Sequence, residues 1–455
     1  MGTKPVGRLL TQYALPAIIA MTASSLYNMV DSIFIGQGVG ALAISGLAVT
    51  FPFMNLSAAF GAGVGVGSSS YLSVKLGQKD YSTAQRILGN NVTLNIIIGL
   101  VFSVVSLLFL DPILYFFGAS EQTIPYAREY MVIILLGNII THLYFGMNAV
   151  LRAASKPRQA MYTTIFTVVL NSVLDPLFIY TFDMGIRGAA FATILSQTVA
   201  LVWQTSLFSD KSELLHLRRG IYRLDNSIVK NILGIGISPF AMNATACLVA
   251  IFVNQRLLEY GGDLAVGAYG IANRVAFIFV MITMGVNQGM QPIAGYNFGA
   301  REYSRVKQVF WLTVICASAV SFLGFIVSEC CPDIAVSLFT NDPELMALAD
   351  KGLRMMNIAL PLVGFQMVTT NFFQSLGMVH KSIFLSLSRQ LLFLVPLIYF
   401  LPVFFGHKGV WMSFPIADTI SIILSAVMLL MLFRKFRLLN DGDDPSILGS
   451  KIKQA

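Results

Sequence analysis

Residues 16 to 36 read PAIIAMTASSLYNMVDSIFIG, an apolar stretch that carries one acid, Asp31. A carboxylate inside a membrane span costs about 2.5 to 3.5 kcal/mol on insertion scales, so such residues are rarely present without a function. We therefore interpret this stretch as a membrane helix and Asp31 as a functional residue.

The composition of the whole chain also indicates a membrane protein. Of its 455 residues 56% are hydrophobic and 11% are charged, and the mean hydropathy is +0.73, whereas soluble proteins carry about 25% charged residues. The net charge of +8 comes from Lys and Arg in short clusters between apolar runs. That pattern is typical of membrane topology and not of a nucleic-acid-binding face. The four cysteines form no CxxC pair, so neither a disulfide framework nor a metal site is expected.

Apolar runs of about 20 residues, the length that crosses a bilayer, predict an all-α polytopic membrane protein with twelve transmembrane helices. The runs cover residues 10–36, 43–72, 87–109, 126–150, 160–180, 187–208, 229–258, 265–294, 309–328, 346–374, 382–402 and 409–433. Strands of a membrane barrel would alternate polar and apolar residues, and these runs do not. Lys and Arg gather in alternate loops, so the positive-inside rule places both termini in the cytoplasm.

The two halves of the chain repeat each other. The segment LGQKDYSTAQRIL (residues 76–88) aligns with FGAREYSRVKQVF (residues 298–310) at an offset of 222, and Pro16 aligns with Pro239 at 223. Because six spans is an even number, the two copies should have parallel topology. We predict two six-helix lobes around a central cavity, with boundaries at 1–208 for the N-terminal lobe, 209–228 for a cytoplasmic linker, 229–436 for the C-terminal lobe and 437–455 for a cytoplasmic tail.

Three polar side chains of the first half are expected at one depth. Asp31, Asp175 and Thr193 each lie about 8 to 9 Å below the outer end of their predicted span, at about 1.5 Å per residue. Asn171, four residues before Asp175, adds an amide on the same helix face.

This set of ligands suits a small cation or a proton. Oxygen atoms bind hard cations such as Na⁺, and two close carboxylates in a low dielectric favour protonation of one of them. The choice between Na⁺ and H⁺ stays open, and no other cofactor is expected. In the alternative interpretation, Asp175 merely caps or kinks a helix end before Pro176, and Asp31 faces a water-filled vestibule.

Two further features have structural explanations. The run GAGVGVG at residues 61–67 lacks a preceding strand and a following Lys-Ser/Thr, so it predicts close helix packing and not nucleotide binding. Arg389 and Asp418 lie at similar predicted depths in the last two spans, as judged from the number of residues to the span ends. A structural ion pair is favoured for them over a role in transport.

Taken together, these residues resemble the multidrug and toxic compound extrusion (MATE) transporters, most closely the DinF-like branch. The resemblance covers nearly the whole chain and rests on the spacing of Pro16 and Asp31, on the repeated loop segment, and on NSVLDP at residues 171–176. It implies twelve helices in two lobes and export of drug-like cations coupled to inward Na⁺ or H⁺. NorM-type members carry a further acid in the seventh helix, and here none occurs before Glu259.

The resemblance also implies roles for individual residues. Position by position, it implies that the coupling ion binds at Asp31, Asn171, Asp175 and Thr193 and that the first helix bends at Pro16. Tyr27, Tyr130 and Asn148 fall on further polar positions of the branch, and with Gln197 they are the candidate substrate or cavity residues.

We therefore predict a secondary active multidrug exporter and not an enzyme. It would exchange lipophilic or cationic compounds for H⁺ or Na⁺ by alternating access. We expect a monomer in a bacterial-type cytoplasmic (inner) membrane. Its expected partners are its substrates and membrane lipid, and no nucleic acid is expected. One alternative is a flippase for lipid-linked precursors, which would favour a strongly cationic cavity. Another is a membrane-embedded transferase, which would need clustered His/Asp or acidic metal motifs that do not occur here.

Overall fold

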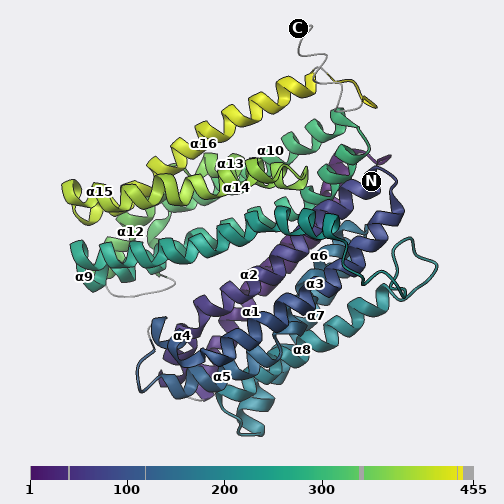
Figure 1. Ribbon diagram of the computed structural model, residues 1–455. Coiled ribbons are helices and arrows are strands. Elements are labelled where there is room, and N and C mark those ends of the chain that lie inside the picture. The colour runs from purple at the N-terminus through teal and green to yellow at the C-terminus, as the bar shows by residue number, and fades with distance from the viewer. Residues whose placement is uncertain (1, 39–40, 118, 338–342, 438, 444–455) are drawn as a thin grey trace. The chain divides into compact units, whose positions relative to one another are not determined.

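The computed structural model shows helices throughout its described part (Figure 1). It describes residues 2–38, 41–117, 119–337, 343–437 and 439–443, and the side chains of residues 26–33, 36–38, 41–42, 44–45, 48, 263 and 437 lie outside this description. Helices are the expected solution, because each backbone N–H and C=O group in a bilayer must find a partner within its own segment.

The helices follow one another in the order of the predicted spans. The first half contains α1 (Val6–Gly38), α2 (Ala41–Gly77), α3 (Tyr81–Leu108), α4 (Leu110–Phe116), α5 (Ile124–Leu136), α6 (Asn138–Ala153), α7 (Pro157–Pro176), the π-helix η1 (Leu177–Thr181) and α8 (Ile186–Leu207). The second half contains α9 (Asn226–Gly299), α10 (Tyr303–Cys330), α11 (Pro332–Ser337), α12 (Pro343–Asn357), α13 (Leu360–Ser375), α14 (Val379–Leu387), the π-helix η2 (Ser388–Leu394), α15 (Val395–Phe405) and α16 (His407–Arg437).

These helices account for the predicted membrane spans. In the described residues, nine helical segments are long and apolar enough to cross a membrane, and the bent pair α5 and α6 makes a tenth. The other two predicted spans correspond to α1 and to the pair α12 and α13. Spans seven and eight form the single element α9, which turns at Gly262 with φ of 69°. The all-helical membrane architecture is therefore confirmed.

Two spans are broken at equivalent places. The fourth span bends by 55° between α5 and α6 at Gly137. The tenth is interrupted at Ala359, 222 positions later, and Pro361, two residues further on, has no N–H to donate. The N–H of Ile140 bonds to Gly137 O at 2.9 Å, and that of Leu362 bonds to Ala359 O at 3.0 Å. The apolar pattern runs through both breaks, so it did not predict them.

The internal repeat is visible in the backbone. Lys79 and Arg301, 222 positions apart, have φ of 60° and 62° and end their helices in the same turn. In the first copy the N–H of the next residue bonds to Lys75 O at 3.0 Å, and in the second it bonds to Asn297 O at 2.9 Å. This 6→1 bond beside a left-handed residue is the Schellman ending of a helix. The predicted parallel repeat is thus confirmed in the local structure.

The chain forms two compact units that do not coincide with its two halves. One unit contains Met1–Ile18 and Ala244–Ala455, and the other contains Ile19–Asn243. The divisions therefore fall inside α1, two residues after Pro16, and inside α9, four residues after Pro239. The lobe boundaries expected from the sequence follow the repeat instead, and they stay a prediction.

Within the second of these units, the glycine run of α2 allows close helix packing. A Cβ on Gly61 would lie 2.9 Å from His142 Cα of α6, and one on Gly67 would lie 2.1 Å from Ile232 O of α9. Backbone atoms occupy the space that side chains would need, so larger residues would separate these helices. The prediction of helix packing for this run is confirmed.

Candidate ion-binding site

The candidate site is built where α7 changes into η1. Asp175 lies in the last turn of α7, directly before Pro176, and the five following residues, Leu177–Thr181, form the π-helix. Proline removes a backbone donor and disturbs the α-helical ladder, and the wider π-turn accommodates the change: Phe182 N bonds to Leu177 O at 3.0 Å. Such π-turns frequently occur at functional sites.

The opposite wall of the site is α8, which approaches η1 closely at Gly188. A Cβ at this position would lie 2.8 Å from the carbonyl carbon of Phe178. Because no side chain separates the two backbones here, Thr193 on α8 comes within reach of Asn171 on α7.

The Asn171 amide connects the two helices. In the orientation that satisfies both of its ends, its nitrogen donates to Oδ2 of Asp175 at 3.0 Å and its oxygen accepts from the Thr193 backbone N–H at 3.0 Å. The Thr193 hydroxyl lies 3.4 Å from the same end of the amide. Asp175 is 0% exposed, Asn171 1% and Thr193 7%. The predicted cluster of these three residues is therefore present in the fold.

The chemistry of these side chains suits a small cation or a proton. An ionised carboxylate taken out of water is costly unless donors or a cation compensate it, and the amide N–H of Asn171 provides one such donor to Asp175. A hydroxyl, an amide oxygen and a carboxylate offer the hard ligands that a small cation needs. In the described residues, no group of three or more His, Cys, Asp or Glu side chains that could hold a metal ion occurs.

Three of the predicted residues lie on α1. The backbone of Tyr27 and Asp31 belongs to this helix, but their side chains lie outside the described part of the chain. Pro16 is buried within α1, which continues as one helix through it from Val6 to Gly38.

The remaining candidates lie on other helices of the same unit. Tyr130 on α5 is 1% exposed and belongs to the hydrophobic core around this site. Asn148 on α6 donates to Ala160 O at 3.0 Å and accepts from Arg152. Gln197 on α8 accepts from the Thr141 hydroxyl at 2.6 Å. Asn148 and Gln197 thus have hydrogen-bonding partners of their own, outside the Asn171 cluster.

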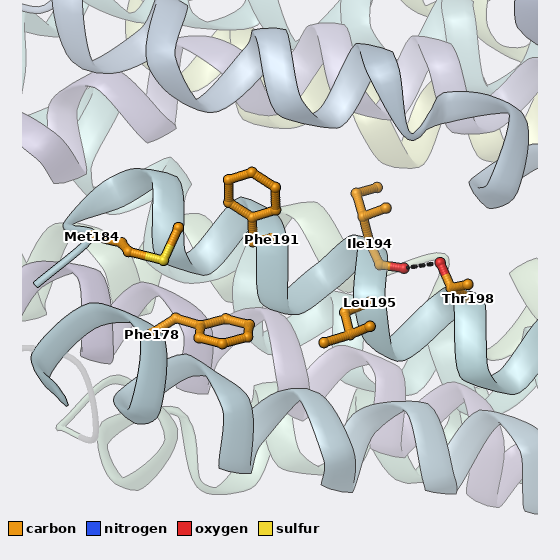
Figure 2. A pocket seen from close by; sticks show the side chains of 6 residues that line it. All are labelled: Phe178, Met184, Phe191, Ile194, Leu195 and Thr198. Atoms are coloured by element: carbon orange, nitrogen blue, oxygen red, sulfur yellow. Dashed lines mark hydrogen bonds between the residues drawn. The ribbon is translucent and has the colours of Figure 1, made fainter. Parts of the chain in front are cut away.

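An apolar groove lies along η1 and α8, next to the site (Figure 2). It has a volume of about 330 Å³ and is lined by Phe178, Met184, Phe191, Ile194, Leu195 and Thr198. Its one hydroxyl is already used, because Thr198 donates to Ile194 O at 2.6 Å. Phe191 and Leu195 are 45% and 42% exposed. Such a surface suits contact with hydrocarbon and not with an ion.

A second polar cluster was missed by the sequence interpretation. The Ser57 hydroxyl donates to Asn138 Oδ1 at 2.7 Å, and His142 Nε2 lies 2.9 Å from Ser57 O. Because a carbonyl can only accept, Nε2 carries the hydrogen. All three residues are buried between α2 and α6. The signal that could have found them is the spacing of Asn138 and His142, four residues apart on one face of an apolar span.

The expected ion pair of the last two spans is present. Arg389 Nε, in η2, donates to Asp418 Oδ1, on α16, at 2.6 Å. The contact confirms that the two side chains pair, as the matched depths indicated, and their role stays a prediction.

The fold and the buried polar site define a multi-pass helical membrane protein with an ionisable group inside its spans. The MatE sequence profile matches residues 16–177 and 237–400. The chain therefore belongs to the MatE family, the MATE transporters.

Individual relatives are similar over nearly the whole length. The chain is 28% identical over 418 residues to the multidrug export protein MepA of Staphylococcus haemolyticus, covering 92% of each protein. It is 27% identical over 438 residues to MepA of Staphylococcus aureus, covering 94% of each. A solved structure described as an outward-facing multidrug resistance MATE family transporter of the MOP superfamily matches with a TM-score of 0.88 at 25% identity, over 94% of this chain and 96% of that one. Assignment to the DinF-like branch stays a prediction.

Proposed function

We propose that this protein is a secondary active multidrug exporter that exchanges lipophilic or cationic drug-like compounds for H⁺ or Na⁺ by alternating access. Its membership of a transporter family supports this proposal, as does its similarity to proteins named multidrug export proteins. The proposed location is the cytoplasmic membrane of a bacterium, with both termini inside, and the proposed functional form is a monomer surrounded by lipid.

One observation carries the proposal. Asp175 is fully buried beside Asn171 and Thr193 at a π-helical turn of a membrane span. Buried intramembrane carboxylates mark ion and proton pathways by default. In our proposal the coupling ion binds at Asp31, Asn171, Asp175 and Thr193.

Coupling requires that ion and drug favour different states of one element. The proposed element is α1, because it carries both Pro16 and Asp31. Tyr27, Tyr130, Asn148 and Gln197 are proposed to contact substrate in some state of the cycle. The two repeats, 1–208 and 229–436, are proposed as the lobes whose rearrangement exposes the substrate to either side.

The test is efflux of a fluorescent cationic dye from proteoliposomes under separately imposed Na⁺ and proton gradients. The wild-type protein is compared with Asp31→Asn and Asp175→Asn. These substitutions keep the size of the side chain and remove its charge. We expect gradient-driven efflux to fall at least about tenfold in each variant, equivalent to about 1.4 kcal/mol, with an unchanged melting temperature in detergent.

The matched control is Asp183→Asn. Asp183 lies in the exposed loop between η1 and α8, with φ of 51° that asparagine also tolerates. This variant should transport as the wild type does. Full gradient-dependent efflux by Asp31→Asn or Asp175→Asn would refute the proposed coupling site, and absence of efflux by the wild type under both gradients would refute the proposed activity.

A further inference from the structure

Each half of the chain carries a cluster of polar side chains on its fifth and sixth spans, but with different residues at different positions. In the first half they are Asp175 with its partners on α7 and α8, and in the second half they are Arg389 in η2 and Asp418 on α16. The repeat aligns Gly185 with Gly406 at an offset of 221, and these residues have φ of 57° and 58°. The second half therefore contains a charged pair of its own and not a copy of the first site.

The residues at equivalent positions show the difference. At an offset of 222, Arg389 corresponds to Thr167, and at 221, Asp418 corresponds to Gln197. Conversely, Asp175 corresponds to Leu397, which has no polar side chain. Two opposite charges have been placed inside the membrane where the other half has neutral groups.

The hydrogen bonding of the pair is incomplete. Arg389 and Asp418 are joined by one bond, Nε to Oδ1, and within the described residues Asp418 Oδ2 and the two Nη groups of Arg389 have no hydrogen-bonding partner. By contrast, the exposed pair Arg128 and Asp111 has two bonds, at 2.8 and 2.5 Å. A buried ion pair compensates its desolvation only when its remaining lone pairs and protons are also satisfied.

The neighbourhood of Asp418 offers further free polar atoms. Ser421 and Ser425 lie three and seven residues later on α16, on the same buried face, and both are 0% exposed. In the described part of the chain neither hydroxyl has a partner. The Asp418 side chain is 9% exposed and that of Arg389 is 29%, so the arginine reaches the surface of its unit while the acid lies beneath it.

The local backbone also marks this place. Arg389 belongs to η2, a seven-residue π-helix within a span that is α-helical before and after it. The element packs against α16, which carries Asp418. Arg389 lies within its π-helix, whereas η1 begins two residues after Asp175. Such turns are frequent at functional sites.

We propose that Asp418 is a second cation-binding site, at which the charged nitrogen or phosphorus centre of a lipophilic organic cation replaces Arg389 as the counter-ion. Arg389 is the internal cation that compensates Asp418 when the site is empty of substrate. The free Oδ2 gives the incoming cation its first contact, and the accessible arginine can move outward as the cation enters. This inference deepens the proposed export function and rests on it for the identity of the ligand.

The test measures equilibrium binding of tetraphenylphosphonium to the full-length protein in detergent, with neutral triphenylphosphine oxide as the uncharged comparison. The decisive variant is Arg389→Gln/Asp418→Asn, which removes both charges and leaves no charge unpaired. We expect it to fold, to bind the cation at least about tenfold more weakly, and to bind the neutral compound as the wild type does. A purely structural pair predicts unchanged binding of both compounds, and that result would overturn the proposal.

The single variant Arg389→Gln gives an effect of the opposite sign. It removes the competing cation, so the folded protein should bind tetraphenylphosphonium more tightly, by about threefold or more. Weaker or unchanged binding by folded Arg389→Gln would contradict the proposal. Where this variant does not fold, the charge-free pair still decides the question. The matched control is Arg128→Gln/Asp111→Asn, which neutralises the exposed, doubly bonded pair and should leave binding unchanged.

The two proposals fail separately. Binding needs no ion gradient, so a wild-type protein that binds the cation through Asp418 but shows no gradient-driven efflux would refute the proposed exporter and retain this site. Gradient-driven efflux combined with unaltered binding in Arg389→Gln/Asp418→Asn would retain the exporter and refute this site.

Discussion

Asn171 and Asp175, one helical turn apart on α7, are joined by a hydrogen bond of 3.0 Å from the amide nitrogen to the carboxylate Oδ2. The same amide accepts from Thr193 on α8, so a single side chain fixes the acid relative to both helices. Loss of the Asn171 amide should therefore alter the site while the charge of Asp175 remains.

We expect Asn171→Leu to weaken binding of the coupling ion and to leave the maximal rate of efflux unchanged. Leucine has a similar volume but can neither donate to Asp175 nor accept from Thr193, and a hydrogen bond to a charged group contributes about 1.5 to 3 kcal/mol. The ion concentration for half-maximal efflux should therefore rise about tenfold or more in proteoliposomes. Ser172→Ala is the control, because the Ser172 hydroxyl bonds to Val168 O of its own helix. Equal ion dependence in Asn171→Leu and the wild type would contradict the assigned role.

Gly67→Ala should destabilise the protein. The added Cβ would lie 2.1 Å from Ile232 O, a backbone atom that cannot rotate away, and overpacking of this kind costs about 1 to 3 kcal/mol. The melting temperature in detergent should fall by several degrees. Gly270→Ala is the control, since no atom lies within 4 Å of the position that its added methyl group would occupy. If Gly67→Ala and Gly270→Ala had the same melting temperature, the close contact of α2 with α9 would be unnecessary for stability.

Asn90→Ala should loosen the segment that follows α8. Asn90 Nδ2 donates to Arg223 O at 3.2 Å and its Oδ1 accepts from Asp225 N at 3.0 Å, so one side chain on α3 holds two places of this segment. Limited trypsin digestion should cut at Arg218 and Arg219 several times faster in the variant. Asn231→Ala, whose amide bonds to Ser227 O within α9, should digest at the wild-type rate. An unchanged cleavage rate in Asn90→Ala would show that other contacts suffice.

The repeat supplies its own control for a helix cap. Asp80 accepts from Thr83 N at 3.1 Å at the start of α3, whereas the equivalent Glu302 makes no side-chain cap bond to α10. Replacing such a cap by alanine costs about 1 kcal/mol. Asp80→Ala should therefore lower the melting temperature at neutral pH more than Glu302→Ala does.

The effect of Asp80 should depend on pH. Burial alone would raise the pKa of the Asp80 carboxyl, but hydrogen bonds from Thr83 and the contact with Lys75 hold the pKa below its ordinary value of 3.8. A lowered pKa in the folded protein means that the stabilisation is complete above that ordinary value and is lost as the pH falls through the lower folded value. The difference between wild type and Asp80→Ala should shrink below about pH 4. A difference that persists at lower pH would exclude the charged form as its cause.

The fold was predictable from the sequence because a bilayer imposes a simple rule. Apolar length gives the spans, and the helix ends agree with them within a few residues at α8 and α16. The breaks at Gly137 and Ala359 were not predictable in this way, because apolar character continues through them. The π-helices η1 and η2 were missed for a similar reason: a single extra residue per turn leaves hydropathy unchanged.

The candidate site could be predicted in part. Asn171 and Asp175 lie four residues apart and so share a helix face. Thr193 was added because its predicted depth below the outer end of its span matches that of Asp175. The Ser57, Asn138 and His142 cluster was not recognised, since two of its contacts join α2 to α6 and depend on how these helices pack. Single-sequence reasoning finds partners within one helix more readily than partners across two.

The division of the compact units inside α1 and α9 has a practical consequence for splitting the gene. A cut in the segment between α8 and α9 would give one fragment whose first eighteen residues belong to the other compact unit, and a second fragment whose residues 226–243 do so in return. Each fragment would lack part of its own core. Separate expression should therefore yield insoluble halves, and co-expression should restore the transporter by fragment complementation.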